Sequence, residues 1–177
     1  MTVLQWATVD VPTGQVSVGC TDQGVAEVRF DAPPANSDAA GPSGLAADAQ
    51  AQLAEYFEGR REEFDLPLDW TGVRGARLDI LTLLAGSVPY GQTVTYGQLA
   101  QRLADRNGRR NVGSRAVGQF MGSNPIPVIV PCHRVVAADG LGGFSGGCGI
   151  ELKRWLLTFE GALPAMLDFG APLLPAG

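Results

Sequence analysis

Short runs of alternating apolar and polar residues occupy the first part of the chain. These runs cover residues 3–9, 15–20 and 25–30, and turn-forming residues separate them at 12–14 and 22–24. Alternation with a period of two places successive side chains on opposite faces of a strand, and Gly, Pro and Asp between the runs favour tight turns. The pattern predicts an antiparallel meander of three strands.

A helical period follows in residues 45–58, and Gly59 marks a C-terminal stop. Its apolar positions are Leu45, Ala49, Leu53, Tyr56 and Phe57. The Pro-, Ala-, Gly- and Ser-rich stretch 32–44 predicts an exposed loop before this helix. Alternation over residues 64–68 predicts a segment that returns to the sheet. We interpret this first part as a structural domain with an acidic surface.

Helical patterns dominate the chain after residue 71. We expect one helix from about residue 73 to just before residue 88, a second that begins after Thr95, a third over about 112–122, and a last one over about 150–160. The last sixteen residues show no clear period and are expected to form a loosely packed tail.

Capping signals support the two middle helices. Thr95 and Gln98 fit a capping box, which places Thr95 at the N-cap. Asn111 or Ser114 is the candidate cap of the third helix. Two short helices joined by a turn form the outline of a helix-turn-helix, whose second helix usually enters a groove of duplex DNA.

Charge is distributed unevenly along the chain. The formal net charge is −5, yet residues 72–160 hold ten Arg and Lys against five Asp and Glu, while the remainder holds three against thirteen. Such asymmetry points to a polyanion-binding half, although a solvated basic face is the commoner explanation of a charge cluster. Five arginines fall within 14 residues: Arg102, Arg106, Arg109, Arg110 and Arg115.

The most reactive residue types lie at 132–134. An apolar run, 126–130, ends at Pro131, and Cys132 is followed directly by His133 and Arg134. A thiol becomes a fast nucleophile when a base or a cation favours the thiolate, and both neighbours are suitable residue types. The run predicts an extended chain, in which adjacent side chains point to opposite faces. His133 therefore need not touch Cys132 directly and could act on it through a water molecule, and the sequence leaves this geometry open.

Composition limits the remaining function classes. The three cysteines are widely spaced and odd in number, which argues against a disulfide framework and for a reducing compartment. A single histidine and the absence of a Cys-x-x-Cys pair leave a zinc site without ligands, so we expect no metal. No apolar run reaches the length of a membrane span, and residues 1–10 do not read as a signal peptide. We therefore expect a cytoplasmic protein.

The motif around Cys132 carries a family resemblance. Pro-Cys-His-Arg-Val at 131–135, with Asn-Pro at 124–125 before it and Gly-Phe-Ser-Gly-Gly at 143–147 after it, resembles the O6-alkylguanine-DNA alkyltransferases, or methylated-DNA–protein-cysteine methyltransferases. The match covers roughly residues 88–161 well and the first part more loosely.

The resemblance implies an α+β fold. A small antiparallel, ribonuclease H-like sheet with a helix would form domain 1–71, a mostly helical, winged helix-turn-helix-like domain would form 72–161, and 162–177 would be a tail. It also implies direct-reversal DNA repair, in which Cys132 takes the alkyl group from O6-alkylguanine, with O4-alkylthymine as a further candidate, in one irreversible turnover after base flipping. The implied partner is double-stranded DNA carrying the lesion, bound by a monomer without a cofactor.

Catalytic roles follow from the same resemblance. Cys132 would be the nucleophile, and His133, oriented by Glu160, would accept its proton through a water. Asn124 would hold the active-site loop to the recognition helix by hydrogen bonds. Tyr96 would donate a hydrogen bond to N3 of the guanine. From the residues alone, Glu160 reads as a surface charge and Tyr96 as a core aromatic.

Contacts with DNA and with the flipped base complete the expected site. Arg115 would enter the duplex where the damaged nucleotide has left, because its planar guanidinium can stack and hydrogen-bond. Ser114, Arg109 and Arg110 would bind DNA beside it. The alkylguanine pocket would comprise Val135, Phe144, Ser145 and Gly146.

The chain departs from the family pattern at several places. Phe144 stands where a tyrosine is usual, Arg77 stands where a phenylalanine is usual, and Leu81-Thr82 replaces Val-Trp. The loop between the two middle helices is longer and more basic, and Cys148 adds a thiol near the pocket. These differences bear on substrate range and DNA contacts.

Two other function classes compete with the alkyltransferase. A Cys-His hydrolase would use the same nucleophile for acyl transfer, but it needs an oxyanion hole that no motif here supports. A non-catalytic lesion-binding protein would share the fold but would lack the reactive cysteine, whereas Cys132 is present.

Overall fold

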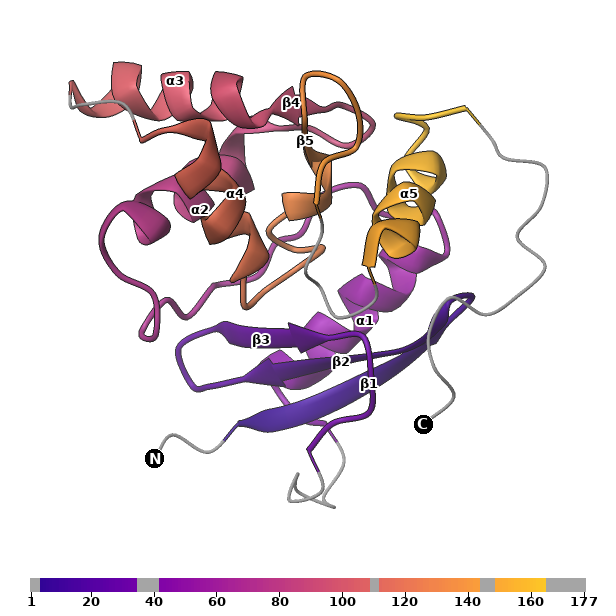
Figure 1. The fold of residues 1–177 in the computed structure, drawn as a ribbon. Helices are drawn as coiled ribbons and strands as arrows, with labels where there is room; N and C mark the ends of the chain where they lie inside the picture. Colours follow the sequence, from indigo (N-terminus) through magenta and orange to yellow (C-terminus); the bar gives the residue numbers. More distant parts are fainter. Residues whose placement is uncertain (1–3, 35–41, 109–111, 144–148, 165–177) are drawn as a thin grey trace. The chain divides into compact units, whose positions relative to one another are not determined.

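The computed structural model describes residues 4–34, 42–108, 112–143 and 149–164 (Figure 1). The chain divides between Gly72 and Val73 into two compact units. Each unit has its own set of secondary-structure elements, so each is described separately below.

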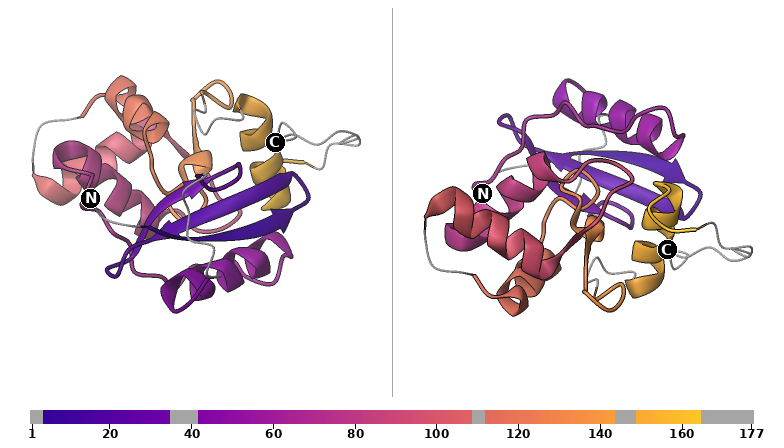
Figure 2. Two further views of the ribbon diagram at one scale, coloured as in Figure 1. Left: turned by 90° about the horizontal axis from the view of Figure 1, so that it is seen from below. Right: turned by 90° about the horizontal axis from the view of Figure 1, so that it is seen from above.

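A three-stranded antiparallel sheet forms the N-terminal unit. Strands β1 (Gln5–Val11), β2 (Gly14–Cys20) and β3 (Val25–Arg29) lie in chain order, as the alternating pattern predicted. Helix α1 (Leu45–Phe57) packs on β1 and β2 and covers one face of the sheet (Figure 2). Val16, Val18, Leu53 and Tyr56 are fully buried and form the core of this unit.

The segment 64–68 returns to the sheet, as its alternation predicted, but it pairs at a single position and forms no continuous strand. Only Leu68 bridges to Val25, as an isolated pair, with Val25 donating to the carbonyl of Pro67 and Asp69 donating to Val25. Pro67 has no N–H, which prevents a continuous ladder at this point. Gly24 makes the close approach possible, since a Cβ there would lie 2.6 Å from the backbone of Leu68.

The C-terminal unit is mostly helical. Helices α2 (Gly75–Ser87), α3 (Tyr96–Asn107) and α4 (Ser114–Gly122) pack against one another, and α5 (Gly149–Phe159) closes the unit (Figure 1). Two short parallel strands, β4 (Val94–Thr95) and β5 (Val135–Val136), join the start of α3 to the segment after Cys132.

The capping box at Thr95 is confirmed. The Thr95 hydroxyl accepts from the Gln98 N–H, and the Gln98 side chain accepts from the Thr95 N–H. The start of α4 differs from expectation, because its N-cap is Gly113 without a side-chain bond and Ser114 is the first helical residue. Asn111, the other candidate cap, lies outside the described residues.

The apolar run before Pro131 is not an extended strand, so this prediction was wrong. Pro127 and Val130 form an isolated bridge around a turn, in which Val128 has a φ of 72°. Cys132 then begins a 3₁₀ turn, Cys132–Arg134. Among the described residues, no helix is long and apolar enough to cross a bilayer.

Candidate active site

Asn124 shapes the loop that carries Cys132. Its side-chain amide donates to the carbonyl of Val130 at 2.9 Å, and its side-chain oxygen accepts from the N–H of Ile126 at 3.0 Å. These bonds fold the apolar run back on itself, which explains why its β-branched residues do not extend. Asn124 also hydrogen-bonds the thiol of Cys132 and favours its ionised form.

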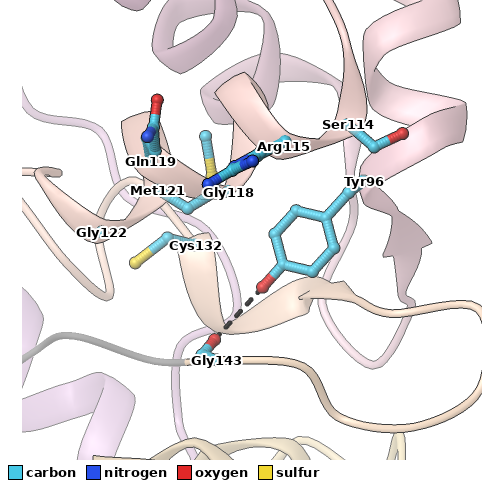
Figure 3. Close-up of a pocket in the computed structure, with 9 residues that line it drawn as sticks. All are labelled: Tyr96, Ser114, Arg115, Gly118, Gln119, Met121, Gly122, Cys132 and Gly143. Carbon is cyan, nitrogen blue, oxygen red and sulfur yellow. Dashed lines mark hydrogen bonds between the residues drawn. The ribbon is translucent and has the colours of Figure 1, made fainter.

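Cys132 lies at the wall of a cavity (Figure 3). The cavity has a volume of about 530 Å³, within the range of roughly 300–1,000 Å³ typical of small-molecule sites. Its lining comes from α3, α4 and the two loops on either side of β5: Tyr96, Ser114, Arg115, Gly118, Gln119, Met121, Gly122, Cys132 and Gly143. Cys132, the expected nucleophile, and two expected DNA contacts, Ser114 and Arg115, therefore share one cavity.

A buried ionic cluster lies next to Cys132 in the chain. His133 Nε2 is 2.7 Å from Glu160 Oε1, and the Arg134 guanidinium donates to both carboxylate oxygens of Glu160, at 2.8 and 2.9 Å. Arg134 also donates to the carbonyl of Val88 and lies over the ring of Tyr90. The side chains of His133 and Glu160 are fully buried, so the interpretation of Glu160 as a surface charge was wrong.

The cluster fixes the charge states of its members. Burial alone would raise the pKa of Glu160, but the hydrogen bonds and charges of His133 and Arg134 lower it to about 2. Burial lowers the pKa of His133, although Glu160 partly offsets this. An ionised Glu160 can only accept, so Nε2 of a neutral His133 carries the proton and Nδ1 is free to act as a base.

Nδ1 of His133 is buried, and no group among the described residues bonds to it. A buried imidazole nitrogen without a partner is rare in folded proteins. The nitrogen belongs to the residue next to Cys132, which fits the expectation that His133 accepts a proton from that side. The bridging water of that expectation stays a prediction.

The thiol of Cys132 favours its protonated form. Burial raises its pKa, whereas the hydrogen bond from Asn124 and the positive charge of Lys153 lower it. Arg134 was expected to favour the thiolate directly, but its guanidinium is bonded to Glu160 and Val88 instead. The cation that acts on Cys132 is Lys153.

Lys153, on α5, is a functional candidate that the sequence analysis missed. Its ammonium group donates to the carbonyls of Val135 at 2.6 Å and Gly143 at 3.0 Å, and to the Tyr96 hydroxyl at 3.3 Å. The residue is fully buried, and burial lowers its pKa to about 8. In the sequence, the one indication that Lys153 is buried is its position directly after Leu152 on the apolar side of α5.

Tyr96 reaches from the first turn of α3 toward the space beside the Cys132 sulfur (Figure 3). Its hydroxyl donates to the carbonyl of Gly143 at 3.1 Å. Burial raises the pKa of Tyr96, and so does the negative charge of an ionised Cys132. Gly142 packs so closely that a Cβ there would lie 2.8 Å from the tyrosine ring. The position facing the cavity contradicts the interpretation of Tyr96 as a core aromatic.

The other expected site residues divide into three groups. Arg115 is exposed on α4 at the cavity, next to Ser114. Val135 is buried in β5 and presents its carbonyl to Lys153 rather than lining the cavity. The remaining expected contacts lie outside the described residues: Arg109, Arg110, Phe144, Ser145 and Gly146. Cys148, the additional thiol, lies outside them as well. Among the described residues, no group of three or more His, Cys, Asp or Glu side chains forms a metal-binding cluster.

Two family profiles match the chain. Residues 4–70 match the 6-O-methylguanine DNA methyltransferase, ribonuclease-like domain, and residues 79–162 match the 6-O-methylguanine DNA methyltransferase, DNA binding domain. Together the two profiles account for both structural units.

Curated relatives and solved structures agree with the profiles. A "DNA base-flipping protein" of Thermus thermophilus is 46% identical over 121 residues, which are 67% of this chain and 76% of that protein. A methylated-DNA–protein-cysteine methyltransferase of Mycobacterium tuberculosis is 34% identical and covers 89% of this chain and 93% of that protein. The crystal structure of Mycobacterium tuberculosis OGT in complex with DNA superposes with a TM-score of 0.72 at 33% identity, over 89% of this chain and 93% of that one. With both structural units matched and Cys132 at the wall of the cavity, this chain belongs to the 6-O-methylguanine DNA methyltransferase family.

Proposed function

We propose that the protein repairs DNA by moving the alkyl group from O6-alkylguanine to its own Cys132. The observation that carries the proposal is the position of Cys132, whose sulfur faces a cavity while the adjacent His133 is held in a buried bond to Glu160. The adjacent residues Cys132 and His133 provide a nucleophile and a base for its proton, and Glu160, at the end of α5, provides the carboxylate that orients the base.

The proposed reaction is a nucleophilic displacement at the alkyl carbon on O6 of the guanine. His133 Nδ1 accepts the thiol proton through one water, and Glu160 stabilises the imidazolium that forms. The thiolate attacks the alkyl carbon, a C–S bond forms, and the bond from that carbon to O6 breaks with its electron pair moving to the guanine. Tyr96 hydrogen-bonds N3 and passes its hydroxyl proton to the departing base, so that the guanine leaves neutral, and the imidazolium of His133 balances the charge of the tyrosinate. The thioether does not regenerate the thiol, which makes the reaction a single turnover.

The target base must leave the helix to reach Cys132. Flipping costs a few kcal/mol because the base loses its stacking and pairing. Arg115, exposed on α4 at the cavity, would enter the vacated position, and Ser114, Arg109 and Arg110 would bind DNA beside it. Phe144, Ser145 and Gly146 are our candidates for contacts with the flipped base, whereas Val135, which does not line the cavity, would act only through Lys153, which its carbonyl holds. Double-stranded DNA with an O6-alkylguanine is the proposed substrate, and O4-alkylthymine is a second candidate.

We further propose that the protein acts as a monomer in the cytoplasm, where a reducing environment preserves a single-use thiol. Each transfer needs one cavity and one cysteine, and both come from one chain. No cofactor enters the reaction scheme.

Intact-protein mass spectrometry tests the proposal. The protein is incubated with a duplex containing one O6-methylguanine, beside the variants Cys132→Ala and Cys20→Ala. We expect a gain of one methyl group per protein that only Cys132→Ala abolishes. Cys20 is a suitable control because it is buried in β2 of the other unit and burial raises its pKa to about 11.

A lesion-binding protein is the second candidate, since the Thermus thermophilus relative carries the name "DNA base-flipping protein". Duplex binding without any gain in mass by the wild type would favour it over alkyl transfer. The presence of Cys132 at the cavity favours transfer.

A further inference from the structure

Arg77 caps a neighbouring helix. It lies in the first turn of α2, and its Nη2 donates to the carbonyl of Ser123, the C-cap residue of α4. The last carbonyls of a helix lack partners within the helix and carry partial negative charge. The last turn of α4 has no basic residue of its own, so the guanidinium of Arg77 provides that charge from α2.

The carbonyl of Ser123 lies between helix α4 and the loop that carries Cys132. Ser123 directly precedes Asn124, whose side chain holds the Cys132 loop. At the other end of α4, Arg115 lines the cavity, and Met121 near its C-terminus does so as well. The hydrogen bond from Arg77 to the Ser123 carbonyl therefore affects the distance between α4 and Cys132.

The side chain of Arg77 is held against the protein and does not extend freely into solvent. The side chain is half-buried, its Nε is buried without a hydrogen-bond partner among the described residues, and α2 packs against α4 (Figure 1).

We propose that Arg77 is a positioning residue that fixes the C-terminal end of α4 relative to the Cys132 loop. The inference rests on the proposed alkyl transfer. A lesion in a duplex must meet Arg115 and Cys132 together, so its reaction depends on their spacing. A free base needs only the pocket, and Asn124 keeps the Cys132 loop closed without Arg77.

The test compares two substrates. Arg77→Met is assayed for transfer from an O6-methylguanine duplex and from free O6-benzylguanine. The matched control is Arg74→Met, because Arg74 is an exposed arginine just before α2 that makes no hydrogen bond or ion pair with the described residues. We expect Arg77→Met to slow the duplex reaction about tenfold, which equals ~1.4 kcal/mol, near the lower end for a hydrogen bond to a charged group. The free-base reaction should stay within about twofold of wild type, and Arg77→Lys should recover part of the duplex rate.

Three results would overturn the inference. Equal slowing on both substrates would mean that Arg77 only stabilises the fold, and unchanged rates on both would mean that the cap has no effect on the site. A smaller dependence of duplex affinity on salt, by about 0.9 in the logarithmic slope, would mean that Arg77 contacts a phosphate instead.

Failure of the proposed function has a different signature. In that case the wild type would transfer from neither substrate, and the affinity for the lesion duplex becomes the readout. A loss of about tenfold in Arg77→Met but not in Arg74→Met, with the salt dependence of the wild type, would still support the positioning role. Equal affinities of the two variants would refute it.

Discussion

Replacement of Glu160 by Gln tests the buried cluster beside Cys132. The carboxylate is fully buried and accepts hydrogen bonds from His133, from two N–H groups of Arg134 and from the backbone N–H of Gly91. An amide keeps the shape but removes the charge, and its NH₂ group faces donors. The guanidinium of Arg134 would then be buried without its counter-ion.

The size of the effect follows from the pKa of Glu160. Its neighbours lower that pKa from 4.5 to about 2, and each pKa unit corresponds to about 1.4 kcal/mol, so the ionised carboxylate contributes about 3 kcal/mol at pH 7. Because the folded pKa is depressed, this contribution is fully present above about pH 4.5 and is lost as the pH falls toward 2. Breaking a buried ion pair by removing one partner costs about 3–5 kcal/mol, a similar size.

Urea unfolding followed by tryptophan fluorescence measures the effect. We expect Glu160→Gln to lower the free energy of unfolding by about 3 kcal/mol at pH 7 and to flatten its fall between pH 5 and pH 2. Glu151→Gln is the control on the same helix, since Glu151 is exposed and its nitrogen–oxygen distance to Arg154 is 3.9 Å; it should change stability by less than about 0.5 kcal/mol. The reasoning fails if Glu160→Gln loses less than about 1 kcal/mol or keeps the acid sensitivity of the wild type.

Three further substitutions probe other contacts of the site. Lys153→Met should raise the pKa of Cys132, because the lysine charge favours the thiolate, and should move the pH profile of alkyl transfer to higher pH; an unchanged profile would exclude this role. Thr95→Ala should lower the free energy of unfolding by about 1 kcal/mol through loss of the capping box, which urea unfolding would detect, and no change would mean that the cap is not important. Gly142→Ala should slow transfer at least several-fold while the protein stays folded, since its Cβ would push Tyr96 away and its φ of 71° suits glycine; single-turnover rates equal to wild type would contradict the close packing.

The parts of the fold that the sequence predicted are those set by neighbours in the chain. The three strands follow from alternation and turn residues within 30 positions, and the start of α3 follows from the reciprocal bonds of Thr95 and Gln98. In both cases the deciding hydrogen bonds or faces are local. Local patterns in the sequence were therefore sufficient to predict the three strands and the start of α3.

The Cys132 loop was predicted wrongly because a side chain decides its backbone. Residues 126–130 are apolar and mostly β-branched, which favours a strand. Asn124 instead bonds to the backbone of Ile126 and Val130 and closes a turn. A strand pattern contains no sign of such a bond, and the left-handed Val128 in this turn runs against its own preference.

The burial of Lys153 and Glu160 in the site could not be predicted from local patterns either. Each belongs to a residue type that is almost never fully buried unless paired. Their partners, Val135 and Gly143 for the lysine and His133 and Arg134 for the glutamate, lie 10 to 27 residues away in the chain. Glu160 was assigned through the family resemblance alone, and Lys153 had no motif to mark it.

The 3₁₀ turn at Cys132–Arg134 explains how one short motif serves two purposes. In an extended chain, Cys132 and Arg134 would share a face and His133 would point away from both. A 3₁₀ turn has three residues per turn, so three successive side chains point in three directions. Cys132 can then face the cavity while His133 and Arg134 both reach Glu160.

The same geometry explains why the cluster combines two basic residues, His133 and Arg134, with one acidic residue, Glu160. Arg134 holds the charge of Glu160 in place, so the carboxylate orients the imidazole without competing for its proton. A proton that leaves Cys132 would stop at His133, because a carboxyl group with a pKa of about 2 is too weak a base to remove it further. In the proposed transfer, the buried ion pair would therefore keep the proton on His133, besides its contribution to the stability of the fold.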